Sequence, residues 1–454
     1  MRSRHPAACA LALAALLAGA ALADWMQPDP SYRDALLEMR SAARDTVGQP
    51  PGAARLDTLA VALLRLGRFA DAQGLFERVL AESPGDEAAA AGLGKLALFR
   101  DDRTRAESLL AIAARTDHEA RLDLYALRLR RGEYAAAAEL AEEAGQAGRA
   151  PLLRLLAEGD GPYAVTAGPE EATLFFVRSY PVPLVRVKLN GQSVLMAVDT
   201  GAGDLLLDNS AARRCKVTVF PEQTTTFWSG SHMAVKNALV SRLDLGGFRV
   251  ERVPAGVLSL HRWSLEVNPV SEPVAGVIGL NLLRRFSPTL DFEAHRLELR
   301  RPGRVAPAAG VAGTLAPAGR VPFELWGENE LMVYGSLNGG RRMALVVQSG
   351  VPGCGVGAPR EVFDEVGVKP GMVARAMKGA GAWLQGRPWA QVMVPTVSVG
   401  PIVRDKVPGW SGALDPGELW RHGVRRDALL SNDFFRGQRV TLDWERRELV
   451  FEGD

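Results

Sequence analysis

The residue with the clearest chemical use in this sequence is an aspartate that follows a short apolar run. Val194–Val198 is apolar, and Asp199-Thr200-Gly201-Ala202 comes directly after it. A glycine lets such a turn pack closely, and a threonine hydroxyl can hydrogen-bond to a facing loop. A carboxylate held there in a low-dielectric environment can have its pKa tuned for acid–base chemistry. We therefore take Asp199 as the candidate catalytic residue.

The elements that would position this aspartate have the pattern of β-strands. Residues 183–189 alternate between apolar and polar side chains, and Asn190-Gly191 is typical of a tight hairpin turn. The apolar run 194–198 then returns as a buried strand. Beyond Gly161 the content of Val, Thr and Phe rises, and Gly and Pro separate short runs. This region is therefore predicted to be all-β.

A second group of segments lies downstream of the aspartate. Gly279 comes 80 residues after Asp199, directly behind the apolar Ile278, and Thr289–Glu293 leads into a further strand-like run. Together with the Asp-Thr-Gly motif, these segments resemble the retropepsin-like aspartic protease domain. The resemblance implies that Ile278 and Gly279 pack behind the catalytic loop. It also implies that the residues after the aspartate support it, namely Thr200, Gly201 and Ala202.

The same resemblance implies a flap, which is a mobile hairpin that covers the substrate. A glycine-bearing turn lies between a Thr-rich run and a Val- and Ala-rich run, at the place where this family carries its flap. The predicted flap residues are Trp228, Ser229, Gly230 and Ser231.

The same plan occurs twice in the chain. Met343–Val347 repeats the apolar run before the aspartate, and Thr441–Glu445 repeats Thr289–Glu293 at an offset of 152 residues. Where copy one has Asp-Thr-Gly, the second copy has a Gln-Ser-Gly motif that begins at Gln348, at an offset of 149 residues. The sequence therefore indicates an internal duplication in which the second motif is degenerate.

These patterns predict a multidomain chain. Residues 24–159 are expected to form an all-α helical-repeat domain, and two all-β retropepsin-like barrel domains are expected to follow as a pepsin-like pseudo-dimer. Copy one covers 172–301, copy two covers 320–452, and a Pro-, Gly- and Ala-rich linker at 302–319 joins them.

The second copy lacks the carboxylate that the resemblance requires. In this family each half supplies one aspartate; one activates water, and the other, protonated, donates to the scissile carbonyl. Gln348 can neither accept nor release a proton at a useful pH. The second copy also has Ser431 where copy one has Gly279, and Asp433 lies beyond the motif. Loss of one acid–base partner typically lowers the rate ~10²- to 10⁴-fold.

Three interpretations follow. Asp199 of one chain could pair with Asp199 of another in a homodimeric aspartic endopeptidase, or Asp199 could act alone and weakly. The third is a non-catalytic pseudoprotease that binds peptides in its cleft. We favour a peptidase of this family that acts on a peptide or protein substrate through Asp199, and no cofactor or metal is implied because water is the nucleophile. The opposing wall of the cleft would be the degenerate second site, Gln348, Ser349 and Gly350.

The first part of the chain is rich in Ala, Leu, Arg and Glu, which is the composition of helices. Gly67, Phe69 and Ala72 have the spacing of the tetratricopeptide repeat, and small residues at Gly67 and Ala72 would let two helices approach closely. Gly132 lies 65 residues after Gly67, which is close to two repeats of about 34 residues. The unit between them has Asp101 where a glycine is expected. Such repeats commonly bind a protein partner; the alternative is a helical spacer or lid.

Residues 1–23 have the pattern of a secretory signal peptide. Basic residues precede an apolar run from Ala7 to Leu22, and small residues come just before the polar Asp24. We therefore expect an exported protein, periplasmic or secreted, with no membrane span after cleavage of the signal.

The charge balance disfavours one class of partner, and the cysteine content bears on disulfide pairing. Lys and Arg total 54 against 52 for Asp and Glu, and no basic block stands out, so a nucleic-acid partner is disfavoured. Cys215 and Cys354 remain after signal cleavage. An oxidising compartment would permit them to pair, but two small buried apolar residues are the favoured interpretation.

Overall fold

The structure, a computed structural model, describes residues 37, 41, 53–159, 161–226, 232–269, 272–302, 317–370, 390–412, 414, 420 and 422–452. The predicted signal peptide, most of the predicted linker and the predicted flap residues Trp228, Ser229, Gly230 and Ser231 lie outside them. Within the described ranges, no helix has both the length and the apolar character needed to cross a membrane.

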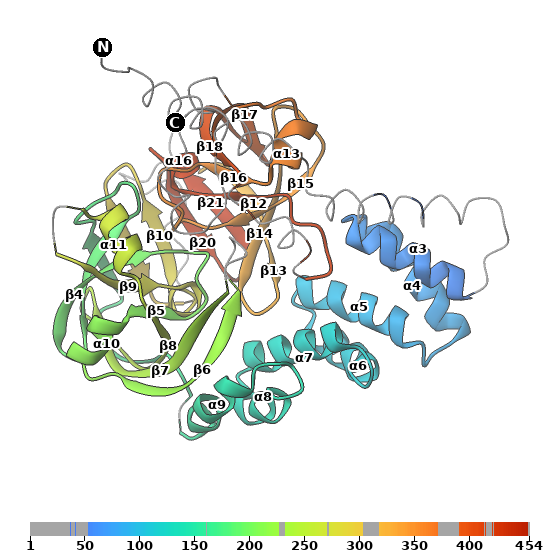
Figure 1. The fold of residues 1–454 in the computed structure, drawn as a ribbon, viewed down its shortest axis with the longest axis horizontal. Coiled ribbons are helices and arrows are strands. Elements are labelled where there is room, and N and C mark those ends of the chain that lie inside the picture. Colours follow the sequence, from blue (N-terminus) through green and yellow to red (C-terminus); the bar gives the residue numbers. More distant parts are fainter. Residues whose placement is uncertain are drawn as a thin grey trace, which may run out of the picture.

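Successive helices pack in pairs in the N-terminal part, as helical repeats require (Figure 1). The elements are α3 (Ala53–Arg65), α4 (Phe69–Glu82), α5 (Glu87–Phe99), α6 (Arg103–Ala113), α7 (His118–Arg131), α8 (Tyr134–Leu140), the 3₁₀ helix η1 (Ala147–Arg149) and α9 (Ala150–Ala157).

The turn inside each helix pair contains one residue with a left-handed backbone. Its φ is +76° at Gly67 and +75° at Gly132, and Asp101 takes +59° in the middle unit. Aspartate tolerates this conformation better than most side chains, so the unit that is degenerate in sequence is complete in structure. Of the two small residues expected to allow close helix approach, Ala72 is fully buried, but the expectation was wrong for Gly67, where no atom lies within 4 Å of an added Cβ. A close approach occurs instead at Gly92, where an added Cβ would lie 2.2 Å from the Phe76 ring.

Copy one is a closed β-barrel. Its ring of strands runs β8-β5-β9-β4-β3-β7, and β7 pairs with β8 to close it, while β1 and β6 extend the sheet. The elements are β1 (Ala164–Ala167), β2 (Glu171–Phe175), β3 (Leu184–Leu189), β4 (Gln192–Val198), β5 (Leu205–Asp208), α10 (Asn209–Arg214), β6 (Thr218–Thr226), β7 (His232–Leu245), β8 (Phe248–Leu258), α11 (His261–Val267), β9 (Val274–Ile278), α12 (Leu280–Leu283), β10 (Ser287–Asp291) and β11 (Arg296–Arg300).

Copy two repeats this barrel. The ring runs β14-β15-β19-β16-β18-β17, and β14 pairs with β17 to close it. The elements are β12 (Pro317–Pro322), β13 (Glu324–Trp326), β14 (Glu330–Leu337), β15 (Met343–Val347), β16 (Val356–Ala358), α13 (Arg360–Glu365), β17 (Ala390–Val399), β18 (Ile402–Ser411), β19 (Ala428–Leu430), α16 (Asn432–Phe435), β20 (Arg439–Asp443) and β21 (Glu448–Glu452).

The same hairpin turn precedes the functional loop in both barrels. Asn190 and Gly191 have φ of +47° and +86°, and Asn338 and Gly339 have +49° and +69°. Two successive positive φ values define a tight turn whose twist matches that of the strands it joins. The turn therefore sets the register of the strand that ends at the functional loop in each copy.

A six-stranded sheet joins the two barrels. Its order is β12-β21-β20-β10-β11-β2, so each copy contributes three strands and β10 pairs with β20 at the centre. Thr289 lies opposite Thr441 in that pair, and their hydroxyl oxygens are 2.7 Å apart. These two residues are equivalent in the duplication, so a local two-fold axis passes between them. The two-barrel, pepsin-like pseudo-dimer that the sequence predicts is therefore confirmed, although β12 starts at Pro317, inside the predicted linker.

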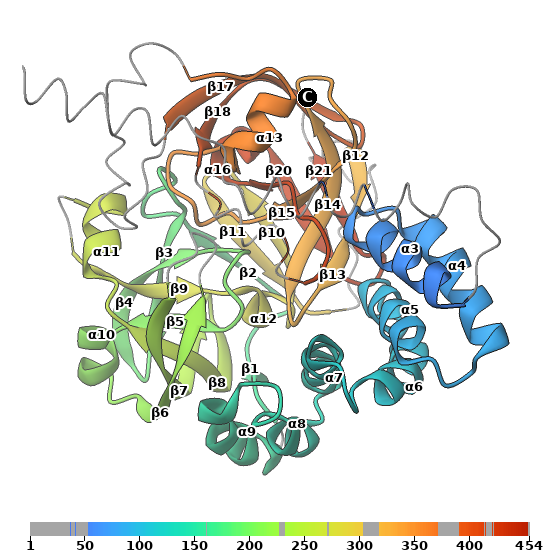
Figure 2. The ribbon, with the colours of Figure 1, turned by 45° about the vertical axis from the view of Figure 1, so that its right-hand side comes forward.

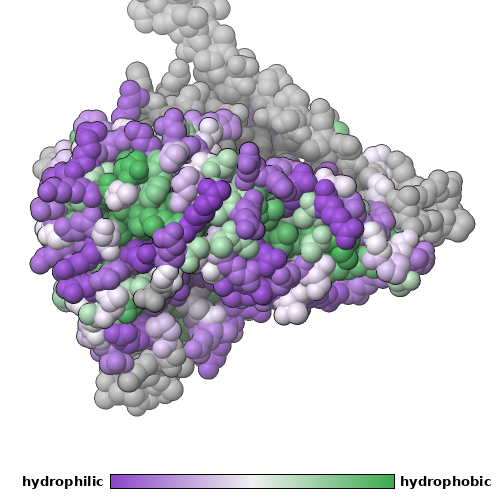
Figure 3. All heavy atoms as spheres, turned by 90° about the horizontal axis from the view of Figure 1, so that it is seen from below, coloured by the Kyte–Doolittle hydropathy of each residue, from purple (hydrophilic) through white to green (hydrophobic). Residues whose placement is uncertain are grey.

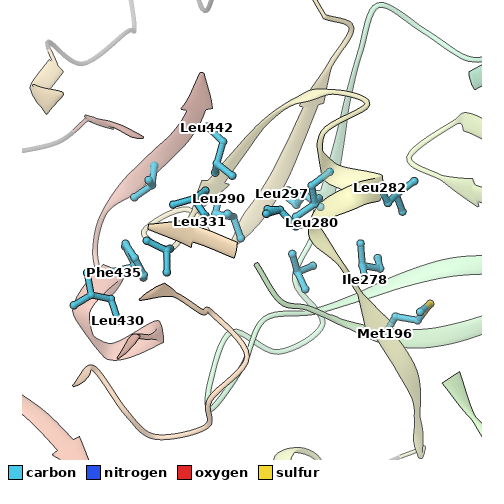
Figure 4. Close-up of a cluster of buried hydrophobic side chains, with 14 of the residues drawn as sticks. Met196, Ile278, Leu280, Leu282, Leu290, Leu297, Leu331, Leu430, Phe435 and Leu442 are labelled. Atoms are coloured by element: carbon cyan, nitrogen blue, oxygen red, sulfur yellow. The ribbon is translucent and has the colours of Figure 1, made fainter. Parts of the chain in front are cut away.

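One hydrophobic core runs through both copies. Figure 4 shows side chains of copy one, such as Met196 and Ile278, continuing through Leu290 and Leu442 of the central sheet to Leu430 and Phe435 of copy two. These side chains are almost completely buried. Because burial of apolar surface is the main stabilising contribution, the two barrels are stabilised together.

The helical part lies along the two barrels, with its first helices beside copy two and its last beside copy one (Figure 2). Against copy two, the Phe99 ring stacks on the Trp326 ring with centroids 4.6 Å apart. Against copy one, Gly148 of η1 is so close to β6 that an added Cβ would lie 2.5 Å from the Glu222 carbonyl oxygen. Figure 3 shows that hydrophilic side chains cover most of the molecule as seen from below, with apolar areas between them.

Candidate active site

The loop that carries Asp199 is held by β4 and β9. These strands are parallel, Val198 lies opposite Ile278, and the Asp199 N–H donates to the Ile278 carbonyl oxygen at 3.0 Å. Beyond Gly279, the Leu280 N–H donates to the Ala202 carbonyl oxygen at 2.7 Å. The structure thus places Ile278 and Gly279 directly behind the loop.

The loops of the two copies bind each other through Thr200 and Ser349. The Thr200 hydroxyl donates to the Val347 carbonyl oxygen at 2.9 Å and accepts from the Ser349 N–H at 3.1 Å. The Ser349 hydroxyl accepts from the Thr200 N–H at 3.0 Å and donates to the Val198 carbonyl oxygen at 3.2 Å. Both side chains are buried, so these four bonds are shielded from water and fix the loops relative to each other.

Asp199 and Gln348 lie at equivalent positions across the local two-fold axis. A Cβ added to Gly350 would lie 2.1 Å from Oδ2 of Asp199, and a Cβ added to Gly201 would lie 2.1 Å from Cγ of Gln348. Each functional side chain therefore rests on the glycine of the opposite loop. The structure brings together one carboxylate and one carboxamide within a single chain.

The environment of Asp199 raises its pKa to about 6. Burial is the largest cause, because it disfavours the charged carboxylate. Hydrogen bonds from the backbone N–H groups of Gly201 and Gly350 act in the opposite direction. Gln348 carries no charge, so it neither shares a proton with Asp199 nor repels its ionised form. Asp199 is therefore ionised at neutral pH and protonated in mild acid.

Asp199 opens into a cavity of about 590 Å³. Its walls come from all three parts of the chain, and they include Thr224 and Thr225 of β6, Glu328 and Gln348 of copy two, and Leu122, Asp123 and Tyr125 of α7. The described strands β6 and β7 pair as far as Thr226 and His232, and the predicted flap residues lie between these two, outside the described residues. The volume is within the range of small-molecule and peptide pockets.

Copy two holds its own loop in a different way. A Cβ on Gly279 would lie 2.3 Å from the Gly203 carbonyl oxygen and 2.4 Å from that of Asp204, so only glycine fits there. In copy two, the Ser431 hydroxyl accepts from the Val351 N–H at 3.2 Å and donates to its carbonyl oxygen at 3.0 Å. The serine thus replaces close backbone packing with hydrogen bonds, which keeps the second loop in place without a glycine.

Two other groups noted in the sequence lie away from the cleft. Asp433 lies on α16 and forms an ion pair with Arg436 at 2.6 Å. Cys215 and Cys354 are separate free thiols, and both are buried. They therefore pack as small apolar side chains.

Sequence reasoning missed an ionic bridge between the helical part and the loop that follows Asp199. Arg149 of η1 donates to Asp204 and to Glu328, each at 2.7 Å, and so joins the two barrels. Asp204 also accepts from Asn281 at 2.8 Å and from the Tyr163 hydroxyl. The partners of Arg149 are 55 and 179 residues away, and no local pattern could have indicated them.

The helical part also covers copy two through a buried charge cluster. Lys95 of α5 lies 3.2 Å from Asp123 and 3.1 Å from Glu119, both on α7, and donates to the His422 carbonyl oxygen at 2.7 Å. Lys95 and Asp123 are buried. The face that α5 and α7 present is thus occupied by this chain's own copy two.

Two parts of the chain are similar to known protein families. Residues 185–282 match the family model described as aspartyl protease, and residues 63–129 match the tetratricopeptide repeat. No curated protein matches the chain. Among solved structures, a retropepsin-like aspartic protease from Rickettsia conorii is 15% identical, covering 29% of this chain and 89% of its own, with a TM-score of 0.20. Residues 185–282, which include Asp199, are thus similar to the aspartyl protease family, and residues 63–129, which precede them, are similar to the tetratricopeptide repeat.

Proposed function

We propose that this protein is a peptidase in which a single ionised aspartate, Asp199, activates water while Gln348 faces it from copy two. The observation that carries the proposal is the position of Asp199. Its carboxylate lies in a complete catalytic loop, in a cavity of about 590 Å³, with a pKa of about 6 and the Gln348 carboxamide opposite.

The chemistry needs one base and one hydrogen-bond donor. Ionised Asp199 takes a proton from water as the water oxygen attacks the peptide carbonyl carbon, and the C=O π electrons move to the carbonyl oxygen. The Gln348 amide N–H donates to that oxyanion, which is a role that side-chain amides can fill. Protonated Asp199 then gives its proton to the leaving nitrogen as the C–N bond breaks. The products are a carboxylic acid and an amine, and Asp199 is ionised again.

This mechanism is slower than that of a two-aspartate enzyme. A carboxamide stabilises the oxyanion by hydrogen bonding but transfers no proton, so the general-acid contribution of a second carboxyl is lost. That contribution is ~10²- to 10⁴-fold. We therefore expect slow cleavage of peptides rather than efficient digestion of proteins.

Two contacts argue against pairing of Asp199 between two chains. Thr200 already exchanges its hydrogen bonds with Ser349 of the same chain. The central edge of copy one, β10, is already paired with β20 of copy two. A homodimer built on copy one would have to break both, so we propose that the working unit is one chain.

A second candidate function is peptide binding without cleavage. The observation that favours it is Gln348, because the position of the second acid holds a group that cannot titrate. The cavity would then hold an extended peptide, and the helical part would contribute its α7 wall to the same site. We further propose export of the protein on the basis of residues 1–23.

Cleavage of a peptide library by the mature protein separates the two functions. We expect slow cleavage by the parent, loss of cleavage in Asp199→Asn, and parent-like cleavage in the control Asp433→Asn, which removes a carboxylate outside the cleft. Peptides that bind but stay intact in the parent would support the binding function instead. Cleavage that survives in Asp199→Asn would contradict the peptidase proposal.

A further inference from the structure

A second cavity, of about 360 Å³, lies between the helical part and copy one. It shares Arg149, Asp204 and Glu328 with the wall of the active-site cavity. Its other charged lining residues are all arginines, which are Arg103, Arg130, Arg131, Arg284 and Arg285. With six arginines against two carboxylates, the lining has a positive net charge.

Three of these arginines have a carboxylate partner. Arg149 binds Asp204 and Glu328, as described above. Arg103 pairs with Asp101 at 3.0 Å, and Arg131 pairs with Glu107 and Glu133.

The other three arginines, Arg130, Arg284 and Arg285, pair with no acidic side chain in the part of the chain that the structure describes. Arg284 lies over the Trp444 ring and Arg285 over the Tyr163 ring, at 5.6 and 5.4 Å from the centroids. Aromatic faces offset only part of the charge of a guanidinium. The cavity therefore holds three guanidinium groups outside any ion pair of the described residues, while its two carboxylates, Asp204 and Glu328, share the one guanidinium of Arg149.

The N–H groups of these arginines are used differently. Arg130 donates to the backbone carbonyl oxygens of Leu98 at 2.9 Å and Leu325 at 2.7 Å, so it contributes charge and joins the repeats to copy two. The Arg284 guanidinium makes no hydrogen bond with another described residue, so its N–H donors are available in the cavity. Arg285 donates to the Pro162 carbonyl oxygen at 3.4 Å and keeps its other donors. Arg130 is therefore fixed by several bonds, whereas Arg284 is the most open of the three to a ligand.

Electrostatics support an anionic occupant. The pKa of Arg130 is lowered to about 9, mainly by burial and then by the charge of Arg284, while the charges of Asp101 and Asp123 act in the opposite direction. The pKa of Arg284 is lowered as well, by burial first; the charge of Asp101 opposes this effect, and the charges of Arg103 and Arg285 add to it. Like charges held together in a partly dehydrated space destabilise one another, and a bound anion would remove that cost.

We propose that this cavity binds a small multivalent oxyanion, of carboxylate or phosphate type, through the guanidinium groups of Arg284 and Arg285 beside the fixed charge of Arg130. Guanidinium groups match the geometry of both oxyanions. The volume suits a small molecule and excludes a folded partner.

The site would also act on the catalytic loop, because Arg149 lies in both walls. An anion in the cavity competes with Asp204 and Glu328 for Arg149. Asp204 lies five residues after Asp199 in the chain and binds Asn281 just behind the loop. Occupancy would therefore loosen the contact between the helical part and the cleft. Binding itself does not rest on peptidase activity, so it can be tested whether or not Asp199 cleaves peptides.

The test is calorimetric titration of the full-length mature protein with pyrophosphate and, separately, with citrate, at an ionic strength held constant with sodium chloride. We expect one of the two to bind at one site with Kd below ~1 mM. Pyrophosphate alone would indicate a phosphate-type ligand and citrate alone a carboxylate type; binding of both also supports the site. Loss of one charge-assisted hydrogen bond should weaken binding about tenfold in Arg284→Gln and in Arg285→Gln.

The matched control is Arg213→Gln, an exposed arginine on α10 outside the cavity, which should bind as the parent does. Arg285 is exposed, so Arg285→Gln provides the test even if Arg284→Gln fails to fold. No binding of either anion by the parent would overturn the proposal. Unchanged affinity in Arg285→Gln, or an equal loss in Arg213→Gln, would overturn it too.

Discussion

The Asp199 carboxylate and the Gln348 carboxamide face the same cleft from equivalent positions of the two copies, and each rests on the glycine of the opposite loop. An aspartic protease needs a carboxyl group at both positions, because one acts as base while the other donates a proton. Here the symmetry of the backbone is kept while the symmetry of the acid–base groups is lost.

Replacing Gln348 with aspartate should create the second acid of a dyad. Two carboxyl groups so close cannot both ionise, so one would stay protonated and could donate to the substrate carbonyl. We expect the rate of peptide cleavage by Gln348→Asp to rise ~10²-fold or more, with an optimum in mild acid. The measurement is a pH–rate profile with one fluorogenic peptide. If Gln348→Asp is folded but cleaves no faster than the parent at any pH, the cleft lacks more than the second carboxyl group.

The parent protein should show the opposite pH dependence. Its base is Asp199, whose pKa is about 6, so kcat/KM should increase as the pH rises through 6 and then level off. The check is a profile between pH 4 and pH 8, with folding followed by circular dichroism. An optimum in acid for the parent would mean that a protonated carboxyl takes part, contrary to a mechanism with one ionised aspartate.

The same pKa makes Asp199 unfavourable for stability. A carboxyl whose pKa is raised from 3.8 in the unfolded chain to about 6 in the folded protein binds more protons when folded, so stability falls as the pH rises between these values. Asp199→Asn should remove that loss, so its free energy of unfolding at pH 7 should be about 1–3 kcal/mol higher than that of the parent. The measurement is chemical denaturation of both proteins at pH 7. At pH 4 the gain should be small. A variant that is less stable than the parent at pH 7 would contradict the raised pKa.

Thr200 and Ser349 should behave as one unit. Thr200→Val and Ser349→Ala each leave buried backbone groups without partners, at a cost of about 2–3 kcal/mol in the free energy of unfolding. The two substitutions remove different bonds of one network, but loops loosened by the first substitution gain less from the bonds that the second removes, so we expect the double variant to lose less than the sum. Chemical denaturation of the four proteins gives the coupling energy. A coupling close to zero would show that the two loops are held independently.

Gly279 should tolerate no side chain. An alanine Cβ would lie within 2.4 Å of the carbonyl oxygens of Gly203 and Asp204, and the backbone would have to move. We expect Gly279→Ala to lose about 3 kcal/mol or more of stability, together with its activity. The control is Gly74→Ala in α4, which has no atom within 4 Å of the added Cβ and should gain about 0.5–1 kcal/mol. Equal effects of the two substitutions would contradict the close packing behind the loop.

Local and repeated patterns in the sequence predicted much of the fold. Asn190-Gly191 specified a turn that needs two positive φ values, and the repeated offset of 149 residues paired Asp199 with Gln348. Residues that correspond by these sequence offsets occupy equivalent positions in the structure, because a two-fold axis relates the two copies. The sequence also predicted that a threonine hydroxyl would reach across to a facing loop, and Thr200 does so.

The position of the helical part could not be predicted in this way. Lys95 binds a carbonyl group 327 residues further along, and Arg130 reaches copy two 195 residues away. Single ion pairs and backbone contacts of this kind have no periodicity, because they depend on how two finished surfaces meet. The contribution of Tyr125 and Asp123 to the wall of the cleft, and the arginine-lined cavity, therefore required the structure.

The hydroxyl groups of Thr200 and Ser349 carry a consequence for how such a duplicated chain can change. A bond exchanged across a two-fold axis needs a competent group from both halves, so neither half can lose it without loosening the whole molecule. The fold does not need a titrating group in the cleft: copy two has Gln348 at that position, and its backbone hydrogen bond to Leu430 is kept. The assembly of the molecule and its proton chemistry therefore depend on separate residues of one short loop. One half can give up its chemistry and still be indispensable as the scaffold of the other.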